Sequence, residues 1–143
     1  MTGAASRNRG ARAERAVVNY LRQWWPDARR VLAGDGRQDC DVTFHPRVSL
    51  EVKDRQSSSW PSWARQAVAQ SKPGTIPMVV RRTRGVTDVG RWVVRLPIGD
   101  LNVSGSLRPM PVLPRLWVET SLAHVVVALL DDDGRLDEWQ TTR

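Results

Sequence analysis

Apolar side chains recur at steps of three and four along residues 7–25, which is typical of one face of a helix that ends before Pro26. The apolar members of this stripe are Val17, Val18, Leu21 and Trp25. Glu14 lies on the same stripe, where a carboxylate is costly unless a cation or hydrogen-bond donors meet it. Glu14 is therefore a candidate site residue. The alternative is an acid near the helix start that interacts favourably with the helix dipole.

Short segments of strand-like pattern follow this helix. The first, at residues 28–33, leads into the glycine-rich turn 34–36. The next two, at residues 40–44 and 48–53, flank the three-residue connection 45–47. Two alternating runs joined by so short a connection predict a β-hairpin.

The length of that connection sets the register of the hairpin. It places Val42 opposite Leu50 and, one position along, Asp41 opposite Glu51, with Cβ atoms of directly opposed residues about 4.5–5.5 Å apart. Because side chains alternate between the two faces of a strand, Lys53 shares the face of Asp41 and Glu51. The polar face is expected to carry Asp39, Asp41, Glu51 and Lys53, and the core face Val42, Leu50 and Val52.

The second half of the chain predicts further elements with weaker patterns. They are a helix at 62–71, strands at 76–80, 91–96 and 116–119, and either a helix or a buried strand at 121–130. Ser62 is expected to cap the first of these helices, with Ala64, Ala67 and Val68 on its inner side. Residues 97–114 are rich in Pro, Gly and Ser and predict short elements at most.

The charge of the chain is positive and unevenly distributed. The net charge is +7, and residues 1–100 carry 18 Lys and Arg against 9 Asp and Glu, whereas residues 101–143 carry 4 against 6. Such an excess favours a polyanionic partner, either nucleic acid or an acidic surface. The alternative is a coding bias that writes arginine freely.

Cysteine content and apolar runs exclude several classes of protein. Cys40 is the only cysteine, which excludes a disulfide framework and a cysteine-rich zinc site. The sequence contains no apolar run of membrane-spanning length and no signal-peptide pattern. We therefore expect a soluble, cytoplasmic protein without a membrane partner, from a bacterial cell or a phage-infected host.

Lysine is rare in this chain, with two residues against twenty arginines. One of the two occupies Glu51-Val52-Lys53, although the composition predicts only roughly 0.06 Glu-x-Lys triplets by chance. Lysine is a compact ammonium whose pKa shifts readily on burial, whereas arginine stays charged. The lysine at this position is therefore a candidate for a chemical role.

The opposed carboxylates of Asp41 and Glu51 predict a metal site. Two such groups repel each other unless a cation lies between them, and Mg²⁺ prefers one or two carboxylates together with water and substrate phosphate. Glu14 is a candidate third ligand, directly or through water. Lys53 is then placed to orient an attacking water and to neutralise developing charge. The alternative is a cross-strand charge network without catalytic role.

This constellation resembles the PD-(D/E)xK nucleases, and more narrowly the archaeal-type Holliday-junction resolvases and their phage and bacterial relatives. The matching segments are Arg9-Gly10-Ala11-Arg12-Ala13-Glu14-Arg15, Asp41-Val42, Glu51-Val52-Lys53 and Gln66 on the following helix. The match spans roughly residues 7–101. Two departures are Cys40, where the family usually has proline, and the loop 33–36, which lacks the serine often found there.

The resemblance implies an α/β fold of the restriction-endonuclease type, in which helices flank a mixed sheet with the core order αβββαβ. We expect a nuclease core over residues 1–102, with residues 103–143 as a C-terminal extension packed on the same domain. The catalytic residues implied are Glu14, Asp41, Glu51, Lys53 and Gln66. Of these, Asp41, Glu51 and Glu14 are expected to bind Mg²⁺, for which Mn²⁺ substitutes.

The activity implied is that of an endonuclease which makes paired nicks in four-way DNA junctions as a homodimer, without a small-molecule cofactor. Hydrolysis by this family leaves a 5′-phosphate and a 3′-hydroxyl. Two alternatives stay open: a nuclease of the same superfamily that cuts flaps, single strands or duplex in repair or restriction, and a DNA-binding module without catalysis. The basic charge fits all three.

Arginines in three regions are candidate phosphate contacts, which would add affinity without sequence choice. They are Arg7, Arg9, Arg12, Arg15, Arg55, Arg81, Arg82 and Arg84. A solvated basic surface is the alternative. Trp60 and Trp63 are candidates for stacking on unpaired bases, with packing in a core as the alternative.

Overall fold

A six-stranded mixed sheet forms the centre of the computed structural model, which describes residues 3–32, 40–55, 59–97 and 116–142. The strand order β1-β2-β3-β4-β5-β6 follows the chain. The strands are β1 (Arg29–Arg30), β2 (Val42–Thr43), β3 (Val48–Lys53), β4 (Ile76–Arg81), β5 (Val93–Pro97) and β6 (Trp117–Ser121). Strands β3 and β4 are parallel, and the other neighbouring pairs are antiparallel.

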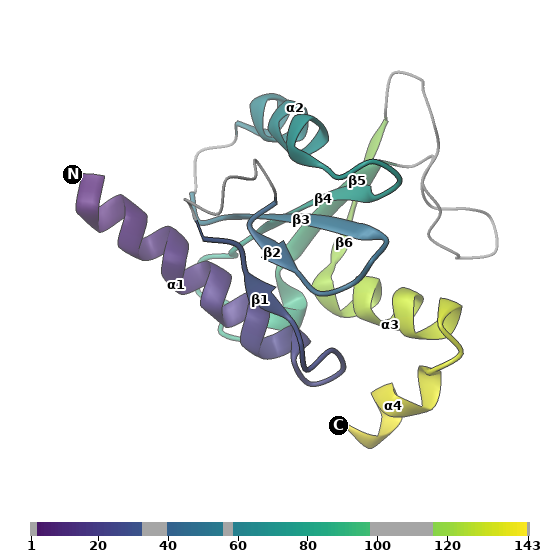
Figure 1. The fold of residues 1–143 in the computed structure, drawn as a ribbon. Helices are drawn as coiled ribbons and strands as arrows, with labels where there is room; N and C mark the ends of the chain where they lie inside the picture. The colour runs from purple at the N-terminus through teal and green to yellow at the C-terminus, as the bar shows by residue number, and fades with distance from the viewer. Residues whose placement is uncertain (1–2, 33–39, 56–58, 98–115, 143) are drawn as a thin grey trace.

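Helices cover both faces of this sheet. They are α1 (Gly3–Leu21), α2 (Trp60–Gln70), α3 (Leu122–Asp132) and α4 (Leu136–Thr141), with the 3₁₀ helix η1 (Val89–Arg91) before β5. Figure 1 shows α2 on one face of the sheet, and α1 and α3 on the other. The predicted α/β class, a mixed sheet flanked by helices, is therefore confirmed. Among the described helices, none combines the length and apolar character needed to cross a membrane.

The two faces of the sheet bury different side chains, because successive residues of a strand point to opposite sides. On the face of α1 and α3, the core includes Val17 and Leu21 of α1, Val48, Leu50 and Val52 of β3, Met78 and Val80 of β4, and Val126 and Leu129 of α3. On the face of α2, the buried cluster is smaller and consists of Trp60, Trp63, Ala67 and Val79. Most of the apolar core therefore lies on the α1–α3 face.

The hairpin register predicted from the sequence is confirmed. Val42 pairs with Leu50, and β3 spans the predicted residues 48–53. The first helix begins and ends four residues earlier than predicted, at Gly3 and Leu21. Trp25 lies in the turn that follows, where its backbone N–H donates to the carbonyl of Leu21 at 2.9 Å, four residues back as in a helix. Its side chain is buried, as the apolar stripe predicts.

The predicted cap of the second helix is wrong, and of its predicted inner side, Ala64, Ala67 and Val68, only Ala67 is buried. The helix begins at Trp60, and Ser62 lies within its first turn, where its hydroxyl donates to the carbonyl of Ser59 at 3.0 Å. The buried residues are Trp60, Trp63 and Ala67, whereas Val68 is 39% exposed. The two indoles bury far more apolar area than alanine or valine side chains, so they turn the helix toward the sheet.

The C-terminal residues join the same sheet and core. Strand β6 pairs with β5 from Val93 opposite Ser121 to Pro97 opposite Trp117. The segment 121–130, for which the sequence left two possibilities, is helical, and the Ser121 hydroxyl accepts from the His124 N–H at 3.3 Å as an N-cap. Most of the Pro-, Gly- and Ser-rich segment lies outside the described residues.

The end of α3 is tied to the loop between β2 and β3. Arg47 donates to Asp132 at 2.9 Å and to Asp133 at 3.2 Å. His45 Nδ1 accepts from the Arg47 N–H at 3.2 Å, so Nε2 carries the hydrogen that is donated to Asp133 at 2.9 Å. These two aspartates therefore serve internal contacts.

Candidate active site

The predicted carboxylate pair lies on the face of the sheet that α2 covers. Glu51 and Lys53 occupy alternate positions of β3, opposite in direction to Leu50, which lies in the main core. The pairing of Val42 with Leu50 places Asp41, one residue back, opposite Glu51. Asp41 Oδ2 accepts from the backbone N–H of Val52 at 2.8 Å, which fixes this carboxylate against β3.

Glu51 is a buried carboxyl group that is satisfied on one side only. Its residue is 1% exposed, and its Oε2 accepts from Lys53 Nζ at 3.3 Å. Its Oε1 is buried, and no N–H or O–H group of the described residues donates to it. Burial, and then the negative charge of Asp41, raise the pKa of Glu51 from 4.5 to about 7, while the Lys53 ammonium opposes this shift. A proton shared between the Glu51 and Asp41 carboxyl groups, or a cation bound between them, would stabilise this arrangement.

Lys53 connects the carboxylate pair to helix α2. Its Nζ donates to Glu51 and also to Gln66 Oε1 at 3.0 Å. Gln66 Nε2 in turn donates to Gln70 Oε1 at 3.2 Å, one helical turn further on. The Lys53 side chain is 16% exposed, so the ammonium lies at the edge of the site. The structure thus brings Asp41, Glu51, Lys53 and Gln66 together.

Glu14, the remaining predicted catalytic residue, has a partner that the sequence did not indicate. Arg30 of β1 donates to Glu14 Oε2 through Nε and through Nη2, both at 2.7 Å. The Glu14 side chain is 17% exposed. The cation expected for an inward carboxylate of α1 is therefore this arginine, and the role of Glu14 as a metal ligand stays a prediction.

The donor set suits Mg²⁺ more than it suits metals that need a full protein cage. Within the described ranges, no three His, Cys, Asp or Glu side chains come close enough to hold a metal ion together. Asp41 and Glu51 supply hard oxygen ligands from two carboxyl groups that interact directly with each other. Mg²⁺ is usually bound by one or two carboxylates and completes its shell with water and phosphate. The pair therefore fits this ion.

The arginines predicted to contact phosphate lie in different surroundings. Exposed residues are Arg7, Arg9, Arg12 and Arg15 on α1, with Arg55 after β3 and Arg84 after β4. Arg81 and Arg82 at the end of β4 are half-buried, and Arg82 donates to Asp54 at 3.2 Å. Arg12 and Arg82 line one cavity of about 310 Å³ between α1 and the β4–η1 connection.

The tryptophans of α2 pack on the sheet, which agrees with the alternative given above, packing in a core. Trp60 and Trp63 are 9% and 6% exposed, and their ring centroids are 5.3 Å apart in an edge arrangement. Arg95 and Arg81 lie over the Trp60 ring, with Cζ at 3.9 Å and 5.5 Å from its centroid. Sequence reasoning missed Arg95, because nothing local indicates a contact between residues 35 positions apart.

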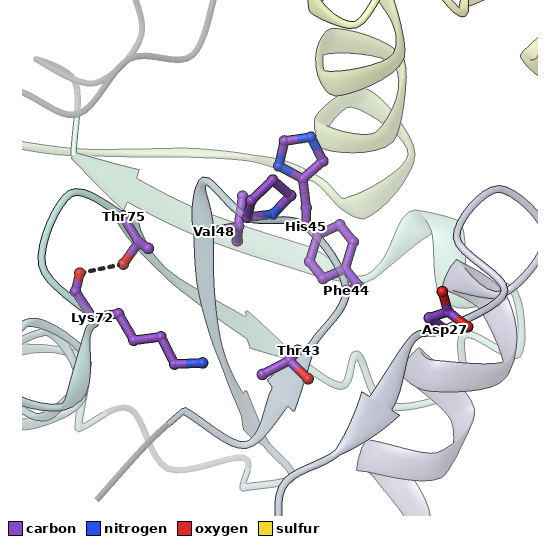
Figure 2. Close-up of a pocket in the computed structure, with 8 residues that line it drawn as sticks. Asp27, Thr43, Phe44, His45, Val48, Lys72 and Thr75 are labelled. Carbon is purple, nitrogen blue, oxygen red and sulfur yellow. Dashed lines mark hydrogen bonds between the residues drawn. The ribbon is translucent and has the colours of Figure 1, made fainter. Parts of the chain in front are cut away.

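A separate pocket of about 260 Å³ lies beside the β2–β3 loop (Figure 2). Its lining includes Thr43, His45 and Lys72, the second lysine of the chain. Thr75, also in the lining, donates to the Lys72 carbonyl at 2.7 Å. Since none of the predicted catalytic residues lines this pocket, it is distinct from the carboxylate pair.

Comparison with known proteins assigns no family to the chain. No family model matches it, and neither a curated protein nor a solved structure does. We therefore infer a function from the geometry of the carboxylate pair and its neighbours.

Proposed function

We propose that this protein is a Mg²⁺-dependent DNA endonuclease of the PD-(D/E)xK type that cuts four-way junctions. The observation that carries the proposal is the buried Glu51 carboxyl beside Asp41, with one oxygen to which no described residue donates. A buried oxygen that accepts no hydrogen bond costs free energy, and a cation bound between Asp41 and Glu51 would offset that cost.

Asp41 and Glu51 would bind the metal ion. When bound, Mg²⁺ acts as a Lewis acid on a phosphate oxygen and lowers the pKa of a coordinated water. The fixed position of Asp41, which accepts from the Val52 N–H, and the rigid β3 backbone under Glu51 orient both carboxylates before substrate arrives. The cost of the buried carboxylate is then offset in the loaded enzyme.

Lys53 would act on the substrate side of the site. Its ammonium is oriented by Glu51 and Gln66 and reaches the surface, where it positions the attacking water and neutralises charge on the phosphate. In the reaction, the water oxygen bonds to phosphorus and gives up a proton, the bond from phosphorus to the 3′ oxygen breaks, and that oxygen takes up a proton. The products are a 5′-phosphate and a 3′-hydroxyl.

Two observations support a nuclease fold and a DNA partner, and the motif resemblance alone selects a junction among DNA substrates. The order α1-β1-β2-β3-α2-β4 is that of the αβββαβ core, and β3 and β4 are parallel on either side of α2. The four arginines of α1 listed above are exposed on one helix, where they suit a polyanion. The motif resemblance is to junction resolvases, which act as homodimers on two strands.

The test is a cleavage assay on end-labelled four-way junction, flap and linear duplex, with Mg²⁺ or with EDTA. Paired symmetric nicks only in the junction, and only with metal, are expected for wild type. Glu51→Gln should abolish them, while Asp137→Asn, the same chemical change at an exposed position of α4, should not. The size-exclusion mass should be that of a dimer.

Other outcomes select the alternatives. Equal cutting of linear duplex would exclude a resolvase and favour a nuclease of broader substrate range. Junction binding without cutting in Mg²⁺ or Mn²⁺ would favour a DNA-binding module. A strict monomer could not make paired cuts in one binding event, which would also count against a resolvase.

A further inference from the structure

Basic side chains continue from the carboxylate pair across the α2 face of the sheet. In the parallel register, Lys53 of β3 pairs with Arg81 of β4, and neighbouring strands lie about 4.8 Å apart. Arg95 of β5 pairs with Val79 of β4, so it shares the face of Val79 and Arg81. Three cationic side chains therefore lie on three adjacent strands.

Trp60 brings two of these cations together. The Arg95 guanidinium carbon is 3.9 Å from the centroid of the Trp60 ring, and that of Arg81 is 5.5 Å away. A tryptophan face attracts a cation within about 6 Å, and a planar guanidinium also stacks on it. Trp60 is 9% exposed, so packing of α2 on the sheet fixes its ring, and the ring in turn orients the guanidinium groups.

The two arginines differ in how their charge is balanced. Arg95 donates to Glu119 of β6 at 3.0 Å. Arg81 has no ion pair and no side-chain hydrogen bond within the described residues, although it is half-buried and pairs in register with Lys53. An unbalanced guanidinium next to another cation is repelled by it unless an anion lies between or above them.

We propose that Arg81 binds a phosphodiester group of the substrate strand, next to the one that is cut, with Trp60 as its positioning residue. This inference rests on the proposed function for the location of the cut. The guanidinium fork matches two oxygens of one phosphate, which a lysine at the same place would bind as a point charge. Lys53 then contacts the phosphate that reacts, and Arg81 contacts the adjacent phosphate of the same DNA strand.

The inference is tested by the salt dependence of binding to a four-way junction in EDTA, where no cutting occurs. Arg81→Ala should lower the slope of log K against log salt by about one unit per subunit and weaken binding about tenfold at low salt. Arg91→Ala removes the same charge from an exposed position of η1 and should change both far less. Arg81→Lys should restore the slope but only part of the affinity.

The role of Trp60 is read from a double-mutant cycle. Trp60→Leu should weaken binding in the wild-type background and add nothing in the Arg81→Ala background, since both changes remove one interaction. Trp60→Phe, which keeps an aromatic face, should restore most of the loss. If the two substitutions add, Trp60 does not act through Arg81. Thermal unfolding confirms that each variant is folded.

Failure of this inference is distinguishable from failure of the proposed function. If Arg81→Ala and Arg91→Ala have the same salt slope and the same affinity for the junction, the inference is overturned, whatever the cleavage assay shows. If wild type binds the junction but never cuts it, the nuclease proposal is overturned. The phosphate site at Arg81 still stands in that case if Arg81→Ala lowers the slope of log K against log salt. Wild type that binds no DNA overturns both.

Discussion

On the α1–α3 face of the sheet, β3 buries Val48, Leu50 and Val52 in the main apolar core, whereas the same strand presents Glu51 and Lys53 on the α2 face. The first set belongs to the buried cluster that also holds residues of α1 and α3, and its side chains have no polar group to satisfy. The second set has a buried carboxyl oxygen that accepts from no donor in the described part of the chain, and an ammonium at the edge of the site. We therefore propose that one set of residues of this strand serves stability and the other serves chemistry.

This difference has a physical cause and a cost. A strand shows alternate residues to its two sides, so apolar and polar roles can be separated within six residues. A buried carboxylate lowers stability, whereas apolar burial raises it. We therefore expect substitutions on the α2 face to affect cleavage and those on the α1–α3 face to affect unfolding. The predictions below test that separation.

The largest effect is expected for the neighbours Asp41 and Val42. Asp41→Asn removes a negative ligand and should lower the cleavage rate by about a thousandfold, since metal stabilisation of the transition state is several kcal/mol. Val42→Ala should lower stability while the folded protein keeps its rate, because Val42 is fully buried in the main core. Single-turnover cleavage with urea unfolding of each variant is the measurement, and a rate loss for Val42→Ala as large as that for Asp41→Asn would break the comparison.

The next effect concerns stability at two adjacent residues of β3. Leu50→Ala should lower the free energy of unfolding by about 3 kcal/mol, because it leaves a cavity in the main core. Glu51→Gln should leave that free energy unchanged or raise it at pH 8, since it removes a buried charge. Urea unfolding at pH 8 measures both. A loss for Glu51→Gln equal to that for Leu50→Ala would show that the Lys53 contact matters more than burial.

A pH dependence of stability should follow from Glu51. Its pKa is raised from 4.5 to about 7 in the folded protein, so the folded state keeps the proton that the unfolded state loses first. The contribution is fully present below pH 4.5 and is lost as the pH rises to about 7, by about 3 kcal/mol in total. The difference between wild-type and Glu51→Gln unfolding curves isolates this group. A difference that does not change across this range would contradict the burial of an ionisable Glu51.

The smallest effect is expected for Gln66. Gln66→Ala should lower the cleavage rate about tenfold, because Lys53 loses one of its two contacts and keeps the one to Glu51. Gln70→Ala is the matched control one turn further along α2, since Gln70 contacts Gln66 and not the lysine. Equal cleavage rates for the two variants would show that Gln66 has no role in the site.

The strands and their register were predictable because they depend on local pattern. The three-residue connection after Phe44 fixes the pairing of Val42 with Leu50, and that pairing alone places Asp41 beside Glu51. The face of α2 was not predictable in the same way. Small apolar residues and two indoles offered competing inner sides, and contact with β4 and β5 decided between them.

Long-range partners were beyond the reach of the sequence. The position of Glu14 on an apolar stripe indicated that a cation should meet it, but it did not indicate Arg30, which the fold brings from β1. The same holds for Arg95 over Trp60. Asp39, which the register places on the polar face, lies outside the described residues.

Mn²⁺ binding at pH 8, followed by electron paramagnetic resonance of the free ion, tests most directly whether the carboxylate pair is a metal site. Wild type is expected to take up Mn²⁺, and Asp41→Asn and Glu51→Gln are each expected to lose that uptake, whereas Asp137→Asn keeps it. Equal Mn²⁺ uptake by wild type and both site variants would contradict the account.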